Sequence, residues 1–302
     1  MRGTWYVVPT TFDEEGALDL ESQRSVVEAA ISWGVDGLTA MGVMSEVHTL
    51  AEGERDSALA AIFAAVGGGV PVAVGCSAGS AEVAAARIAR AASLGAAAAM
   101  VSAPPLARDL DRLPAFFARV AEPGLPIVVQ DEPNATGVTI PVSALLRCLE
   151  AAGSRIVKLE DPPTPPKISR LLDADPELEV FGGLGGVAAL SELRRGAVGT
   201  MTGFAYPEVL AAVRRAVQGG DAAAAAEIFD RYLPLIVFEG QPIVGLAIRK
   251  EVLRRRGAIG AAATRGPVLD PETAEELDEV LARVGIVPGR DRLPVGDRMP
   301  PG

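Results

Sequence analysis

The sequence predicts an α/β fold, a (β/α)8 TIM barrel with a C-terminal helical extension, and three observations predict it. Short apolar runs recur eight times within about 218 residues, and an amphipathic stretch with helical periodicity follows each run. The runs are continuously apolar rather than alternating, which is typical of parallel strands covered on both faces. The alternation is uninterrupted, which favours a closed barrel over an open doubly wound sheet.

The apolar runs predict the strands in chain order. Each run is five or six residues long, which is an ordinary length for a strand. The expected strands are residues 5–10, 37–41, 71–75, 97–102, 126–130, 155–159, 178–182 and 198–202.

Helix start and stop signals predict where the intervening helices begin and end. Ser, Asp or Pro precedes several of them and Gly often follows, as with Ser80 before one helix and Gly34 and Gly95 after two others. The expected helices are residues 20–33, 51–66, 80–94, 113–121, 141–151, 165–173, 187–195 and 207–217.

Three further segments follow the predicted barrel, which we place at residues 1–220. Helical periodicity at 221–238, 241–256 and 270–284 predicts a C-terminal helical extension over residues 221–286. Residues 287–302 are rich in Pro, Gly and Arg, and we expect them to form a mobile tail.

The charge balance excludes several classes of function. The 302 residues carry 28 Lys and Arg against 39 Asp and Glu, so the net charge is −11 and we expect no nucleic-acid partner. A single histidine, His48, cannot form a multi-histidine metal centre. The sequence contains neither a GxxxxGK[ST] phosphate loop nor a GxGxxG dinucleotide motif, so we predict no cofactor and no metal.

The cysteines and the N-terminus indicate a cellular compartment. Cys76 and Cys148 lie far apart and outside any CxxC motif, which is typical of buried thiols in a reduced protein. The N-terminus lacks the charged and apolar regions of a signal peptide, and the longest uncharged run is too weakly apolar to span a bilayer. We therefore expect a soluble, cytoplasmic protein with no membrane partner.

Lysine is rare in this chain: only Lys158, Lys167 and Lys250 occur among the 28 basic residues. Lys158 lies inside a predicted apolar strand, where a charged side chain needs a partner or a function. Unlike Arg, a buried lysine can lose its proton and attack a carbonyl carbon. The residues alone leave two interpretations open, a Schiff-base nucleophile or a structural pair with a carboxylate such as Glu160. We expect Lys167 and Lys250, and the Arg254–Arg256 run, to lie on the surface.

The strand ends carry the other candidate residues, because a barrel places its active site at the carboxyl ends of its strands. The second predicted strand leads into residues 42–46 and the fifth into residues 130–132. The sixth leads into residues 158–161, the seventh into a glycine-rich segment, 182–186, and the eighth ends near Met201.

Four stretches carry a resemblance to the dihydrodipicolinate synthase and N-acetylneuraminate lyase family of class I Schiff-base barrels. Residues 34–55 resemble its GxTGE…LxxxER block, and PVAVG at 71–75 resembles its third strand. PIVVQDEP at 126–133, with the following Thr-Gly, resembles the block that ends in YNxPxxTG, and IVK at 156–158 resembles the lysine strand. The resemblance runs from about Thr4 to Arg256, and it implies that Lys158 forms the imine.

The chain also departs from the family pattern. Val43 and Met44 stand where the family has two hydroxyl residues, and Gln130 replaces the catalytic tyrosine. Pro105 and Leu106 align with a tyrosine pair, which brings the usual interlock between subunits into question. Ala135 replaces the arginine that grips the aldehyde substrate in true dihydrodipicolinate synthases. The departures argue against dihydrodipicolinate synthesis itself.

The resemblance and the strand ends together assign roles. The backbone of the loop formed by Gly42, Val43, Met44 and Ser45 would hold a substrate carboxylate, while Gln130, Gly183 and Met201 would shape the pocket. One of four carboxylates would replace the tyrosine as acid and base, and the candidates are Asp131, Glu132, Glu160 and Asp161. The alternative for the two aspartates is that they cap loops or helices.

These roles predict a class I lyase, of aldolase or dehydratase type, that acts on a 2-keto acid such as pyruvate or a deoxy sugar acid. The resemblance further implies a homo-oligomer, a dimer or a tetramer. Two alternatives remain open at this point. The four carboxylates could hold Mg²⁺ in a metal-dependent barrel lyase, or the chain could be a non-catalytic relative that binds a small acid.

Overall fold

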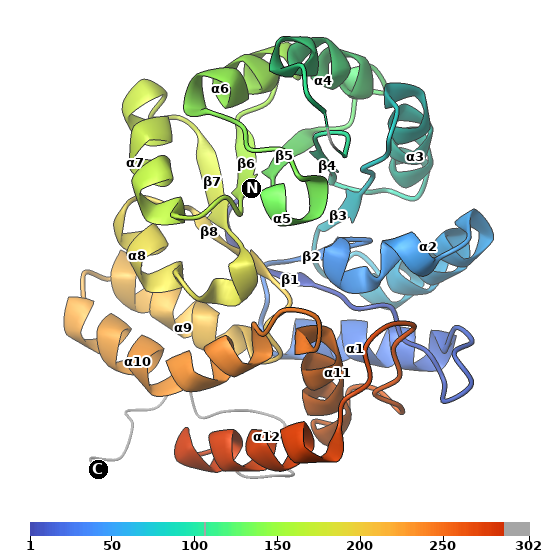
Figure 1. The fold of residues 1–302 in the computed structure, drawn as a ribbon, viewed down its shortest axis with the longest axis vertical. Coiled ribbons are helices and arrows are strands. Elements are labelled where there is room, and N and C mark those ends of the chain that lie inside the picture. Colours follow the sequence, from blue (N-terminus) through green and yellow to red (C-terminus); the bar gives the residue numbers. More distant parts are fainter. Residues whose placement is uncertain (106, 287–302) are drawn as a thin grey trace.

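The computed structural model describes residues 1–105 and 107–286, and its centre is a closed barrel of eight parallel strands (Figure 1). Each strand pairs with its neighbours in the sequence, and β8 pairs with β1 to close the barrel. The strands are β1 (Gly3–Val7), β2 (Gly37–Ala40), β3 (Val72–Gly75), β4 (Ala98–Ser102), β5 (Ile127–Asp131), β6 (Ile156–Leu159), β7 (Glu179–Gly182) and β8 (Gly199–Thr202). The predicted fold class is confirmed.

A ring of helices surrounds the strands (Figure 1). One helix follows each strand on the outside of the barrel, and a further short helix, α5 (Pro133–Thr136), comes directly after β5. The outer helices are α1 (Leu20–Ser32), α2 (Glu52–Val66), α3 (Ala81–Ser93), α4 (Leu113–Ala121), α6 (Val142–Ala151), α7 (Thr164–Ala174), α8 (Ala189–Arg194) and α9 (Pro207–Gln218).

Two hydrophobic clusters hold the barrel together. The smaller one contains residues such as Trp5, Met100, Phe181 and Met201, and the larger one joins the strands to the surrounding helices. The Trp5 and Phe181 rings meet edge to face at 6.3 Å between their centroids. Gly37 in β2 is the register partner of Trp5 in β1, and a Cβ on this glycine would lie only 2.6 Å from the Trp5 ring. Trp5 and Phe181 thus lie together in the smaller cluster, although only 4% of the residues are aromatic.

The first strand differs from its prediction. It spans Gly3–Val7 instead of residues 5–10, because its ladder with β8 begins at Gly3 and runs to Tyr6. Val8 still donates a backbone hydrogen bond to Thr39, but Pro9 has no N–H to continue the ladder. The predicted tail, 287–302, and Leu106 lie outside the described residues.

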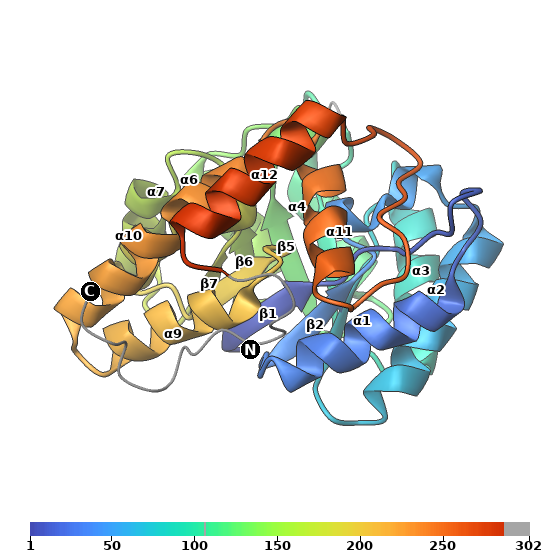
Figure 2. The same cartoon turned by 90° about the horizontal axis from the view of Figure 1, so that it is seen from below.

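The C-terminal extension consists of α10 (Ala222–Glu239), α11 (Gly245–Arg255) and α12 (Pro271–Arg283). The first of these packs against α9 of the barrel, and the other two contact it in turn. Figure 2 shows α12 running obliquely across this face with α11 beside it. Among the described residues, none of the helices combines the length and the apolar character that crossing a membrane would need.

Lys250 connects this extension to the barrel, and the prediction that it lies on the surface is wrong. Its side chain is fully buried, and its Nζ donates to Glu46 Oε1 at 2.5 Å and to the Ala263 carbonyl at 2.7 Å. The ammonium also lies 4.6 Å from the centroid of the Phe12 ring. The backbone N–H of Arg265 donates to the other oxygen of Glu46. The loop after β2 is therefore anchored to α11 by a buried ion pair.

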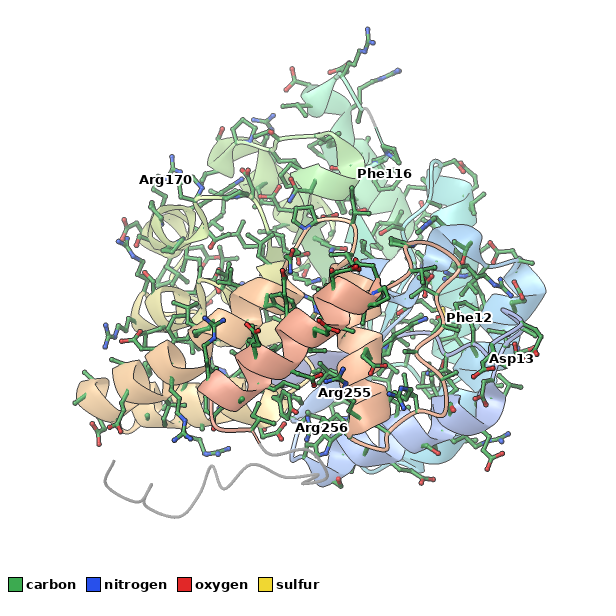
Figure 3. All side chains as sticks on the ribbon, turned by 60° about the horizontal axis from the view of Figure 1, so that its bottom comes forward. Phe12, Asp13, Phe116, Arg170, Arg255 and Arg256 are labelled. Carbon is green, nitrogen blue, oxygen red and sulfur yellow. The ribbon has the colours of Figure 1, made fainter. Side chains whose placement is uncertain are left out.

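The prediction for the arginine run is wrong in one position. Figure 3 labels Arg255 and Arg256 near the end of α11, and Arg256 is buried. Its guanidinium carbon lies 3.7 Å from the centroid of the Trp33 ring, and Nη2 donates to Glu208 Oε1 at 2.7 Å. Only Arg254 is strongly exposed in this run. The end of α11 therefore docks on the barrel helices.

Replacement of Lys250 tests the connection between α11 and the loop after β2. Lys250→Met is expected to lower the free energy of unfolding by about 3–5 kcal/mol, because Glu46 would keep a buried charge without its partner. Urea denaturation measures the change, and the exposed Arg254→Met on the same helix is the matched control, expected within about 0.5 kcal/mol of the parent. A Lys250→Met protein as stable as this control would contradict the prediction.

Candidate active site

Lys158 lies in β6 near the carboxyl end of the barrel, and its side chain is buried. In the sheet it is the register partner of Gln130 in β5 and of Phe181 in β7. Its Nζ forms an ion pair with Glu160 Oε2 at 2.9 Å. The structure therefore agrees with both interpretations from the sequence. Lys158 is paired with a carboxylate, and it also lines the pocket described below, where it could act as a nucleophile.

Glu160 is held from three sides. Besides Lys158, the side-chain amide of Gln130 donates to Oε2 at 2.7 Å, and the backbone N–H of Leu184 donates to Oε1 at 3.2 Å. A carboxylate with these partners stays in one orientation and remains a strong acceptor. Gln130, which the sequence places at the tyrosine position of the family, thus orients Glu160.

Gly183 makes room for this carboxylate. A Cβ at this position would lie 2.3 Å from Glu160 Cγ and 2.4 Å from its Oε1, closer than real Cβ contacts come. The neighbouring glycines face other charged side chains in the same way, Gly182 facing Glu192 and Gly185 facing Arg249. The glycine-rich segment after β7 therefore gives space to buried charged side chains.

A pocket of about 340 Å³ opens over Lys158, a size that suits a small ligand. Its described wall combines apolar side chains with two carboxylates and two cations. The wall consists of Val7, Val43, Met44, Glu132, Lys158, Glu160, Leu184, Gly185, Val187, Met201, Thr202, Gly203, Gly240 and Arg249.

Some of the predicted binding residues line this pocket in the structure, and others do not. Val43, Met44 and Met201 belong to the described wall, whereas Gly42, Ser45, Gln130 and Gly183 do not. Ser45 is buried, and its hydroxyl donates to the Val8 carbonyl at 2.6 Å. That hydroxyl fixes the loop after β2 to the end of β1.

Asp131 and Asp161 surround Lys167 instead of Lys158. The Nζ of Lys167 donates to Asp131 Oδ2 at 2.6 Å, to Asp161 Oδ2 at 2.7 Å and to the Ile140 carbonyl at 2.6 Å. The prediction that Lys167 lies on the surface is wrong, because these three acceptors hold it in the interior. Neither aspartate belongs to the described pocket wall. Together they join the ends of β5 and β6 to α7.

Glu132 is the candidate carboxylate that remains beside Lys158. It lines the pocket, and it precedes α5 at the end of β5. Burial and then the charge of Glu160 raise the pKa of Glu132 to about 7, while Lys158 opposes the shift. A carboxyl group with this pKa can both accept and donate a proton near neutral pH.

The carboxylates do not form one cluster, as the metal-dependent alternative would require. Lysines divide them, since Asp131 and Asp161 bind Lys167 while Glu160 binds Lys158. The part of the chain that the structure describes contains no group of three or more His, Cys, Asp or Glu side chains arranged to hold a metal ion. The geometry therefore favours the lysine chemistry.

Sequence reasoning missed Arg249, which lines the pocket from α11. The strand-end rule could not find it, because α11 belongs to the C-terminal extension. It also missed Leu184, whose backbone N–H binds Glu160. The glycine residues around Leu184 could have indicated this role, since a glycine-rich segment allows the backbone to come close to the site.

Gly183→Ala tests the space that Glu160 needs. The added methyl group would displace the carboxylate, and a displacement near 1 Å is expected to lower kcat about 100-fold. Gly53→Ala in α2 is the control, since a Cβ there meets no atom within 4 Å. Steady-state kinetics on the two variants, with circular dichroism to verify folding, measure the effect. Equal activity of both variants would contradict the assigned role of Gly183.

Comparison with known proteins assigns the chain to a family. Residues 1–284 match the dihydrodipicolinate synthetase family. L-2-keto-3-deoxyarabonate dehydratase of Azospirillum brasilense is 35% identical over 294 residues, which cover 94% of each chain. The 4-hydroxy-tetrahydrodipicolinate synthase of Kineococcus radiotolerans is 31% identical over 290 residues, or 93% of this chain and 92% of the relative.

A solved structure gives the same answer. Dihydrodipicolinate synthase of Rhodopseudomonas palustris superimposes with a TM-score of 0.88 at 30% identity, covering 94% of this chain and 97% of that one. The match covers nearly the whole of both chains, so it includes the barrel and the C-terminal helices. The chain belongs to the dihydrodipicolinate synthetase family, and it is a class I lyase.

Proposed function

We propose that this lyase dehydrates a 2-keto-3-deoxy sugar acid through an imine on Lys158. The observation that carries the proposal is the geometry at the end of β6. There, a buried lysine lies 2.9 Å from Glu160 and shares a pocket with Glu132. The relative named as a dehydratase of such an acid matches nearly the whole chain, which supports the choice of substrate class.

Formation of the imine uses Lys158 and Glu160. Glu160 Oε2 accepts a proton from Nζ, and the neutral amine attacks the C2 carbonyl carbon of the substrate. Glu160 then returns this proton to the hydroxyl group of the resulting carbinolamine, and that hydroxyl leaves as water. The product of this stage is a protonated imine, which can accept electrons from the neighbouring C3–H bond.

Elimination of water uses Glu132. Its carboxylate removes a proton from C3, and the electron pair moves into the imine to give an enamine. Glu132 then donates the same proton to the C4 hydroxyl, which leaves as water while the enamine electrons return. Hydrolysis of the imine releases the product and regenerates Lys158. The reaction thus loses one water overall and needs no redox partner.

The residues that replace the family's hydroxyls and tyrosine support the assignment of the proton transfers of the elimination to Glu132. Val43 and Met44 carry no group that can relay a proton, and the amide of Gln130 does not titrate. A carboxyl group whose pKa is raised to about 7 supplies the missing acid and base. Glu132 is therefore the residue that we assign to both proton transfers.

We also propose that the chain forms a homo-oligomer, a dimer or a tetramer, in the cytoplasm. The family resemblance supports the assembly, and the few, unpaired cysteines support a reducing compartment.

The reaction itself can be followed by NMR with a 2-keto-3-deoxypentonate. The expected product has lost one water, and Lys158→Met is expected to lower the rate about 1,000-fold or more. Arg155→Met, at an exposed position just before the same strand, is the matched control with unchanged activity. Pyruvate and an aldehyde as products would reveal an aldolase instead, and full activity of Lys158→Met would refute the imine.

The pH dependence tests Glu132. Because burial raises its pKa to about 7, the base form is lost as the pH falls below 7, and kcat/KM should decline there. Glu132→Gln is expected to remove this decline and to lower kcat about 100- to 10,000-fold, whereas Glu132→Asp should retain the pH dependence. A Glu132→Gln enzyme with the parent profile and rate would show that another group moves the protons.

A further inference from the structure

Arg249 is a cation that reaches the pocket from outside the barrel. It lies in α11 of the C-terminal extension, it is only 8% exposed, and it lines the pocket that contains Lys158. These two residues are the cations of the described pocket wall, which also contains the acidic Glu132 and Glu160. One of the cations is the proposed nucleophile, so the other is available to bind an anion.

Buried neighbours hold Arg249 in place. Its Nε forms an ion pair with Glu239 Oε2 at 3.5 Å, and Glu239 is fully buried at the end of α10. The same oxygen accepts the backbone N–H of Ala205 at 3.0 Å, which fixes the carboxylate. Glu239 therefore positions the guanidinium without reaching the pocket wall itself.

Gly185 gives the guanidinium its space on the pocket side. A Cβ on Gly185 would lie 2.8 Å from Arg249 Nη2, and the φ angle of +66° also disfavours a larger residue there. Gly185 and Arg249 both line the pocket, so this close approach of backbone and guanidinium lies at its wall.

The hydrogen-bonding capacity of this guanidinium is largely unused. Within the described residues Nε is committed to the ion pair with Glu239, and Nη1 donates a hydrogen bond to the sulfur of Met44, which is a weak acceptor. A guanidinium has five N–H donors, and a buried donor without an acceptor is costly. An oxyanion in the pocket would give the terminal Nη1 and Nη2 donors strong acceptors, and a carboxylate can accept two parallel hydrogen bonds from this end of the guanidinium.

The position of Arg249 indicates which oxyanion it would bind. It touches Met44 in the loop after β2, the loop expected to hold the carboxylate of a keto acid. That loop has Val43 and Met44 in place of hydroxyl residues, and the Ser45 hydroxyl is already bonded to the Val8 carbonyl. The loop side chains therefore offer the carboxylate little, and the adjacent guanidinium is the strongest donor at this end of the pocket.

We propose that Arg249 binds the C1 carboxylate of the 2-keto acid and that Glu239 positions it for this role. The proposal rests on the proposed function and deepens it, since it names the group that selects an acid over a neutral ketone. The carboxylate held by Arg249 places C2 of the substrate beside Lys158. The C-terminal extension thus contributes directly to substrate binding.

The first test compares two carbonyl compounds that differ in charge. Pyruvate and its neutral methyl ester are trapped on the protein with borohydride, and the concentration for half-maximal trapping is measured. Arg249→Met is expected to raise this concentration about 10- to 100-fold for pyruvate and less than about 3-fold for the ester. Arg249→Lys should restore part of the preference, and Arg254→Met on the exposed side of α11 should leave it unchanged. An equal effect on both compounds, or none, would overturn the proposal.

A second test separates this proposal from the imine chemistry. Binding of pyruvate to Lys158→Met and to Lys158→Met/Arg249→Met is measured by calorimetry, so that no imine can form. The double variant is expected to bind about 10- to 100-fold more weakly, and equal binding would overturn the role of Arg249. Failure of the parent protein to trap pyruvate, with this difference intact, would refute the imine alone. If Arg249→Met does not fold, Arg249→Gln/Glu239→Gln removes both buried charges, and the same outcomes apply.

Discussion

Lys158 stays inside an apolar barrel because the Glu160 carboxylate neutralises it at 2.9 Å. An unpaired ammonium at this depth would be costly, and an unpaired carboxylate equally so. Much of the site serves to keep Glu160 in place. Gln130 and the Leu184 backbone donate to it, and Gly183 leaves the space that it fills. The catalytic end of the barrel is thus organised around one buried ion pair.

The same constraint applies to the other two lysines of the chain. Lys167 is held by Asp131 and Asp161, and Lys250 by Glu46. Each of these lysines binds a carboxylate on another element of the fold. The two structural pairs fix the loops after β2, β5 and β6, whereas the Lys158 pair faces the pocket. Its place in the pocket wall therefore distinguishes Lys158, the proposed nucleophile, from Lys167 and Lys250.

The sequence allowed the barrel and the place of Lys158 inside a strand to be predicted, because both depend on local patterns. Eight apolar runs mark the strands, and a lysine within one of them stands out whatever lies around it. Lys167 and Lys250 were misplaced because each binds a carboxylate far away in the sequence, Asp131 at 36 positions and Glu46 at 204 positions. Arg249 was not predicted as a pocket residue for a related reason, since only the packing of α11 over the barrel brings it to the pocket. The positions of these three residues thus depend on long-range contacts, which local sequence patterns do not predict.

The pocket residues depart from the pattern that the family resemblance implies. Where the family resemblance places a phenol and two hydroxyls, this chain has an amide, a valine and a methionine, and its pocket contains a carboxyl group of raised pKa and a guanidinium. We propose that Glu132 and Arg249 took over proton transfer and carboxylate binding. A barrel site can change in this way because its loops and extension vary while the strands keep the lysine in place.

Reduction of the protein with borohydride in the presence of a 2-keto acid, followed by peptide mass mapping, tests the role of Lys158 most directly. The expected result is a single adduct on the peptide that contains Lys158, with the peptides of Lys167 and Lys250 unmodified. All three lysines are buried, so general accessibility does not favour one of them. An adduct on Lys167 or Lys250, or no adduct at saturating keto acid, would contradict the assignment of Lys158 as the imine-forming residue.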